Sequence, residues 1–238
     1  MTNELLLVLS LCGVYLLVLL WYALFGESGL IGWTVFATIA ANIEVMLLVD
    51  AFGMAQTLGN VLFASTFLVT DILSEVAGKK AAGRAVNIGI LTSASFILVS
   101  QSWLLYRPNA EDVIAPSIRA VFSNTPRLML TGLLVYAVVQ RFDVFLYHAW
   151  WRFTERRFGG TRPYLWLRNN GSTLVSQLLN TVLFTLGAFW GVFEPGELLT
   201  VMLSSYVIFI VTSLADTPVV YLARRIHEKR GNAEKAPS

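Results

Sequence analysis

The sequence predicts an all-α fold: a polytopic membrane helical bundle of seven transmembrane helices. The composition is the first reason, because 56% of the 238 residues are hydrophobic and only 13% are charged, whereas soluble domains carry about a quarter. The second reason is that the apolar residues fall in blocks of about 20, the length that crosses ~30 Å of hydrocarbon. The third is that basic residues alternate between successive connections.

Seven apolar segments have the length of a membrane span. They are Leu5–Phe25, Ile31–Val49, Leu58–Val76, Ala85–Tyr106, Leu128–Trp150, Ser172–Val192 and Leu198–Ala223. The first lacks the basic start, the short apolar run and the cleavage site of a signal peptide, so we expect a retained helix. At the other end of the chain, we expect residues 227–238 to form a cytoplasmic polar tail, with Gly231–Ser238 disordered.

Basic residues concentrate after the odd-numbered segments, and such residues resist translocation across the membrane. Thirteen of the 17 Lys and Arg residues lie there: Lys79, Lys80, Arg84, Arg152, Arg156, Arg157, Arg162, Arg168, Arg224, Arg225, Lys229, Arg230 and Lys235. The connections after even-numbered segments carry Asp50, then a balanced set of charges, then Glu194 and Glu197. This alternation predicts an N-terminus outside the cell and a C-terminus in the cytoplasm.

Three carboxylates are predicted to lie at one depth in the membrane. Asp71 precedes Lys79 by eight residues, Asp143 precedes Arg152 by nine, and Asp216 precedes Arg224 by eight. At 1.5 Å per residue, each carboxylate lies ~12–13 Å from its basic flank. Charged groups at that depth are costly and usually face a bundle interior or a cavity. We therefore expect the three to line a common polar layer.

Further polar residues join this layer by helical spacing. Glu75 lies four residues after Asp71, Asn180 and Thr181 follow Gln177 by three and four, and Asn42 with Glu44 falls in the second segment. Ion pairing, helix capping and interhelical hydrogen bonding are the alternative roles for all of them. Pro218 kinks its helix, and Asp216 could instead satisfy the freed backbone groups. Arg141 does not share a helix face with Asp143, and we expect it to pair with a carboxylate of another helix.

A hollow lined by carboxylates and amides suits a small, planar, polar solute. Carboxylates accept hydrogen bonds from ring N–H and exocyclic amino groups, and amides both donate and accept. Aromatic side chains can stack on a heterocycle; the candidates are Phe67, Phe142, Phe184 and Tyr206. The expected partners are therefore a small heterocyclic base and membrane lipid, with a homodimer left open and no nucleic acid. One cysteine (Cys12) and two distant histidines predict no metal site, and we expect no cofactor.

Five stretches resemble the queuosine-precursor transporter family, also called the vitamin-uptake-transporter-like family. In order, they are "ANIEVMLL", "GNVLFASTFLVTDILSEVAGKKAAGR", "QRFDVFLYHAWWR", "WLRNNGSTLVSQLLNTVLF" and "SLADTPVVYLARR". The resemblance runs from about Ile31 to Arg225 and implies a six-helix importer in the bacterial inner membrane. It would make residues 29–226 the six-helix core and residues 1–28 one extra N-terminal transmembrane helix. The implied cargo is a 7-deazaguanine such as 7-cyano- or 7-aminomethyl-7-deazaguanine (preQ0, preQ1), used for queuosine modification of tRNA.

The resemblance also implies residue roles. The implied substrate-binding residues are Asn42, Asp71, Glu75, Gln140, Asp143, Gln177, Asn180 and Asp216, with Thr217 and Pro218 beside them. Glu44, Arg141, Arg168 and Asn169 are candidates for ion pairs or gating. Two positions depart from the family pattern, since Asn180 replaces an Asp and Ala77 replaces a Tyr.

Two other functions stay open at this point. The chain could be a substrate-capture subunit for a vitamin-like solute that works with an ATP-driven partner, because it has no phosphate-binding loop of its own. It could also be an intramembrane enzyme, although no recognised catalytic signature surrounds the carboxylates. We expect a transporter and no enzymatic activity.

Overall fold

The computed structural model describes residues 2–123, 126–159 and 162–233. These residues form eight α-helices, one 3₁₀ turn and one β-hairpin. In chain order, the elements are α1 (Asn3–Phe25), α2 (Glu27–Glu44), β1 (Leu48–Ala51), β2 (Met54–Thr57), α3 (Asn60–Val76), α4 (Lys79–Trp103), α5 (Ala115–Ser123), α6 (Pro126–Phe158), η1 (Arg162–Tyr164), α7 (Leu165–Phe189) and α8 (Pro195–Ala233).

Each of the seven expected spans coincides with a helix. Helices α1, α4, α6, α7 and α8 are long and apolar enough to cross a membrane. Helices α2 and α3 have 18 and 17 residues and are not among these candidate membrane spans. The buried face of α3 carries Ser65, Thr66, Thr70, Asp71 and Ser74. The chain is thus a polytopic helical membrane protein.

The segment after α2 differs from the prediction. The second span was expected to reach Val49, but α2 ends at Glu44, and an antiparallel hairpin pairs Leu48 with Thr57 and Ala51 with Met54. Phe52 and Gly53 form the two-residue turn with positive φ angles of 54° and 71°, the conformation that hairpin turns of this length require. Glu44 therefore lies at the end of a helix and not in the middle of a span.

Two expected connections and the expected polar tail contain helical structure. The connection 107–127 includes the short helix α5. The arginine-rich connection 153–171 is mostly helical, because α6 continues to Phe158 and α7 already begins at Leu165. The polar tail also departs from the prediction, because α8 extends through Ala233; residues 234–238 lie outside the described residues.

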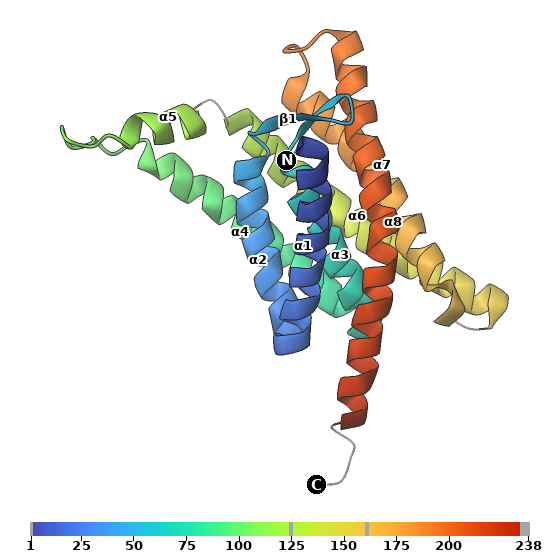
Figure 1. Ribbon diagram of the computed structural model, residues 1–238. Coiled ribbons are helices and arrows are strands. Elements are labelled where there is room, and N and C mark those ends of the chain that lie inside the picture. Colours follow the sequence, from blue (N-terminus) through green and yellow to red (C-terminus); the bar gives the residue numbers. More distant parts are fainter. Residues whose placement is uncertain (1, 124–125, 160–161, 234–238) are drawn as a thin grey trace.

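The bundle has two distinct ends. Figure 1 shows the N-terminus and the hairpin at one end and the C-terminus at the opposite end. We refer to these as the hairpin end and the C-terminal end. The side chain of Asn3 and the backbone of Asp50 are hydrogen-bonded at 2.8 Å, and Glu4 accepts from the backbone N–H of Phe52. Helix α1 is thereby fastened to the hairpin.

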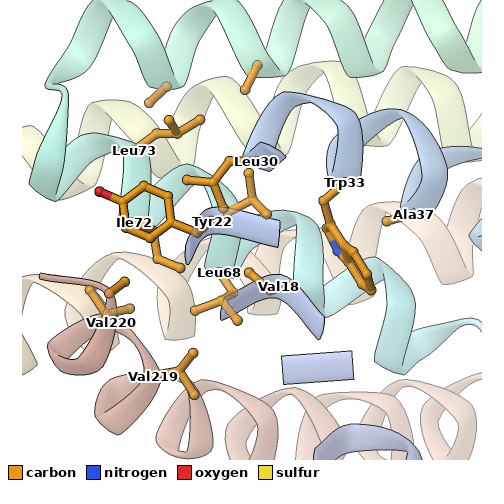
Figure 2. Close-up of a cluster of buried hydrophobic side chains, with 14 of the residues drawn as sticks. Val18, Tyr22, Leu30, Trp33, Ala37, Leu68, Ile72, Leu73, Val219 and Val220 are labelled. Carbon is orange, nitrogen blue, oxygen red and sulfur yellow. The ribbon is translucent and has the colours of Figure 1, made fainter. Parts of the chain in front are cut away.

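The largest hydrophobic cluster joins helix α1 to helices α2, α3 and α8. Figure 2 shows Val18 and Tyr22 of α1 among Leu30 and Trp33 of α2 and Leu68 of α3. Val219 and Val220 of α8 belong to the same cluster. The opposite side of α1 exposes a series of leucines, which is expected of a surface in contact with lipid. The extra N-terminal helix is therefore packed on the core by one face.

Candidate functional site

A partly open cavity enters the bundle near the hairpin end. Six helices and the residues beside the hairpin contribute to its wall, which includes Asn42 of α2, Asn60 of α3, Ser93 of α4, Gly132 of α6, Asn180 of α7 and Ser205 of α8. Segments far apart in the sequence therefore share one cavity wall.

Aromatic rings and amides share the cavity wall. Phe63, Tyr136, Phe184 and Phe209 line it, and the Phe63 ring packs edge-on against Tyr136 with centroids 6.0 Å apart. Phe184 was an expected stacking residue, and the other three were not. The two predicted amides, Asn42 and Asn180, also reach the cavity. The Asn42 amide donates to Ser93 Oγ at 3.2 Å, which connects α2 to α4.

Two glutamines lie next to residues of the cavity wall without lining the cavity themselves. Gln140 is fully buried; its Nε2 donates to Thr66 Oγ1 at 2.7 Å, and its Oε1 accepts from Thr70 at 3.2 Å. Gln177 lies one helical turn from Asn180 and is also buried. Neither polar atom of the Gln177 side chain has a hydrogen-bond partner among the described residues. A buried amide without hydrogen bonds to the protein is available to bind water or solute.

Asp71 of α3 and Asp143 of α6 are both held by hydroxyl groups of α7. Thr173 Oγ1 donates to Asp71 Oδ2 at 2.9 Å, and Ser176 Oγ donates to Asp143 Oδ1 at 2.6 Å. The two carboxyl groups also lie within reach of each other. Each retains one buried oxygen without a hydrogen-bond partner in the described part of the chain. The sequence-based prediction that these two residues converge is confirmed.

Asp216 of α8 is the third carboxyl group in this region, and we call Asp71, Asp143 and Asp216 the acidic layer. Asp216 lies within electrostatic reach of Asp71 and of Asp143, so all three carboxyl groups lie in one region. The hydroxyl of Tyr15 in α1 lies beside the Asp216 carboxyl and donates to the backbone oxygen of Thr212 at 3.1 Å. Asp216 Oδ1 has no hydrogen bond to any described residue. Five helices (α1, α3, α6, α7 and α8) therefore meet in this layer.

Glu75 occupies a different environment from Asp71, although the two share a helix face. Arg168 Nη2 approaches Glu75 Oε2 to 2.6 Å and Oε1 to 2.7 Å, and Arg224 Nη1 lies 3.0 Å from Oε1. Tyr147 donates to the same carboxylate at 2.8 Å. The Arg168 guanidinium also stacks over the Trp151 ring, 4.3 Å from its centroid. We call Glu75, Tyr147, Arg168 and Arg224 the ion-pair cluster.

The ion-pair cluster lies toward the C-terminal end, away from the cavity. Arg168 was expected in a cytoplasmic connection, but it lies in the first turn of α7 and is fully buried. The expectation that it forms an ion pair is confirmed. Because one carboxylate holds groups from α6, α7 and α8 against α3, the cluster joins four helices toward the C-terminal end of the bundle.

Three of the candidate residues for ion pairs or gating belong neither to the acidic layer nor to the ion-pair cluster. Arg141 is exposed, and its Nη2 donates to Asn87 Oδ1 at 3.1 Å, so the expected carboxylate partner is replaced by an amide. Asn169 is buried, and its amide donates to Thr217 at 3.4 Å. Glu44 is half-buried at the end of α2.

Sequence reasoning missed several polar residues that hold the site together. Thr173 and Ser176 precede Asn180 by seven and four residues, so a polar stripe along one face of α7 could have indicated them. Tyr147 follows Asp143 by four residues on α6 and belongs to a similar stripe. For Thr66 the sequence offered no such signal, since threonine is common in helices that pack inside membranes.

Comparison with known proteins finds one matching family and one similar protein of the same kind. Residues 57–223 match a protein family described as "Putative vitamin uptake transporter". The chain is 38% identical over 212 residues to the "Probable queuosine precursor transporter" of Bacillus subtilis (strain 168), an alignment that covers 89% of this chain and 90% of that protein. No solved structure matches the chain. The family match extends from the end of the hairpin into α8 and includes all three carboxylates of the acidic layer.

Proposed function

The chain belongs to the vitamin uptake transporter family, whose members are transporters and not enzymes, and on this premise we propose that it imports queuosine precursors. The cargo would be a 7-deazaguanine such as preQ0 or preQ1, delivered to the cytoplasm for the modification of tRNA. The similarity to a protein named as a queuosine precursor transporter supports this assignment over other vitamin-like solutes. Within the chain, the core of residues 29–226 would carry the solute, with residues 1–28 and 227–238 appended.

One observation carries the proposal: the bundle holds both a partly open cavity with aromatic and amide walls and, outside that wall, buried carboxyl groups whose oxygens lack a hydrogen-bond partner among the described residues. A deazaguanine has flat apolar faces and a polar edge with amine, N–H and carbonyl groups. Aromatic rings suit its faces, and amides and carboxylates suit its edge. Among the predicted substrate-binding residues, Asn42 and Asn180 would meet the solute first, followed by Gln177 and Gln140.

Asp71, Asp143 and Asp216 would act deeper in the pathway. Carboxylates that lie side by side repel each other, and a proton shared between them removes that repulsion. Buried acidic residues of this kind form proton relays in transporters. We therefore include coupling of uptake to protons in the proposal, with the acidic layer exchanging a proton as the solute passes.

The orientation would place the hairpin end outside and the C-terminal end in the cytoplasm of a bacterial inner membrane. The basic residues at the start of α4, at the end of α6 and near the end of α8 support this orientation, since these segments lie toward the C-terminal end of the bundle. The cavity would then receive solute from outside, while the ion-pair cluster closes the cytoplasmic end.

Uptake by the purified protein in liposomes tests the proposal. A labelled deazaguanine should accumulate without ATP, and an ionophore that collapses the proton gradient should reduce the accumulation. Accumulation that requires an added ATP-driven partner would favour a substrate-capture subunit instead. In parallel, binding of a panel of purines, deazapurines and vitamins should rank deazaguanines first, and a protein that binds none of them would contradict the assignment.

A further inference from the structure

The hydroxyl of Tyr136 is a buried polar group without a hydrogen-bond partner among the described residues. Tyr136 lies on α6, lines the cavity and is 4% exposed. Its hydroxyl makes no hydrogen bond of acceptable geometry with any residue the structure describes. Buried hydroxyl groups normally have a partner, and an exception inside a cavity indicates a place for solute or water.

Two threonine hydroxyls from other helices lie close to the Tyr136 hydroxyl. They belong to Thr38 of α2 and Thr66 of α3, and both line the cavity. The Thr66 hydroxyl is occupied, because it donates to the Phe63 backbone at 2.7 Å and accepts from Gln140. The Thr38 hydroxyl has no partner within the described residues. One side of the cavity thus presents two hydroxyl groups that can each donate or accept.

The position of the Tyr136 ring is restricted on two sides. On one side, the ring packs edge-on against Phe63. On the other side, the backbone of α4 comes so close at Gly89 that a Cβ there would collide with the Tyr136 hydroxyl and lie 2.9 Å from its Cζ. Glycine at position 89 therefore provides the space in which the phenol fits. A side chain at that position would push the ring toward the cavity.

We propose that Tyr136 contacts the solute and determines specificity, with Gly89 as the residue that positions it. This inference rests on the proposed function and adds to it. The Tyr136 hydroxyl would bond to a polar atom on the edge of the heterocycle, while Phe184 or Phe209 contacts its face. Because a neutral hydroxyl both donates and accepts, it can distinguish solutes by the polar groups on that edge. The carboxylates, which lie deeper, would not be the first groups to select the solute.

The test compares wild type with Tyr136→Phe and Gly89→Ala in liposome uptake and in binding of purified protein. Gly83→Ala is the matched control, because Gly83 lies on the same helix and an added Cβ there meets no atom within 4 Å. Tyr136→Phe should raise KM for the deazaguanine by about tenfold, the size expected for one lost hydrogen bond, with maximal rate retained. Gly89→Ala should lower affinity too, and Gly83→Ala should not. Thermal unfolding in detergent confirms that each variant is folded.

Competition by analogues provides the discriminating measurement. Analogues that each lack one polar group of the heterocycle should lose affinity for wild type. One of them should lose no further affinity when Tyr136 becomes Phe, because the matching partner is already absent. A folded Tyr136→Phe protein with unchanged KM and an unchanged competition profile would overturn the inference while the proposed function stands. Wild-type protein that neither binds nor carries a deazaguanine would overturn the proposed function and the inference with it.

Discussion

Glu75 and Arg168 form a bidentate ion pair inside the bundle, with Arg168 Nη2 2.6 Å from one carboxylate oxygen and 2.7 Å from the other. Their side chains are 2% and 0% exposed. Taking two charges out of water is costly, and the pair repays that cost only through close geometry and further hydrogen bonds. Tyr147 and Arg224 supply such contacts. The ion pair therefore depends on the packing of four helices, α3, α6, α7 and α8, against one another.

Glu75→Gln should destabilise the protein and abolish uptake. The substitution leaves the buried Arg168 guanidinium without its counter-charge, and breaking a buried ion pair typically costs ~3–5 kcal/mol. Thermal unfolding in detergent measures this loss. Glu228→Gln is the control, because the Arg224–Glu228 pair is 3.4 Å long and more exposed, and exposed pairs contribute ~0–1 kcal/mol. Equal stability of the two variants would contradict the expectation.

Asp71→Asn should abolish uptake without a comparable loss of stability. Asparagine keeps the shape of the side chain and still accepts the hydrogen bond from Thr173, but it cannot exchange a proton. Uptake is measured in cells that cannot make queuosine precursors, and membrane fractions confirm that the variant is inserted. Normal uptake by the Asp71→Asn protein would remove this carboxylate from the transport pathway.

Tyr15→Phe should reduce stability by about 1 kcal/mol, the usual contribution of one buried hydrogen bond. The phenylalanine loses the bond to the Thr212 backbone and the contact with Asp216. Tyr106→Phe is the matched control, because Tyr106 is 72% exposed. If the Tyr15→Phe protein were as stable as the control, helix α1 would contribute through its hydrophobic contacts alone.

Cysteine labelling should find the two ends of the bundle on opposite sides of the membrane. Cys12→Ser removes the single native cysteine, after which Glu194→Cys and Lys229→Cys each introduce one at an exposed position. In intact cells, a reagent that cannot cross the membrane should label position 194 and not position 229. The reverse pattern would contradict the orientation that the basic residues predict.

Much of the fold follows from short-range features of the sequence. Hydrophobic blocks of spanning length located all seven expected helices, and counting residues from basic flanks placed Asp71, Asp143 and Asp216 at one depth. Both inferences use the constant rise of a helix and the membrane's demand that polar groups be satisfied inside the bundle. The hairpin was missed because the apolar run continues from α2 into β1, so hydropathy gives no boundary at Glu44.

What the sequence by itself determined is therefore the class of protein, its helices and the depth of its acidic layer. The tertiary structure decided which neighbours these residues have: Glu75 meets Arg168 and Arg224, whereas Asp71, one turn away, meets Thr173 and Asp143. It also decided that Tyr136 lies against Gly89 at the cavity wall. The physical reason is that periodicity places a side chain on a face of its own helix, but the packing of helices distant in the sequence determines what that face contacts.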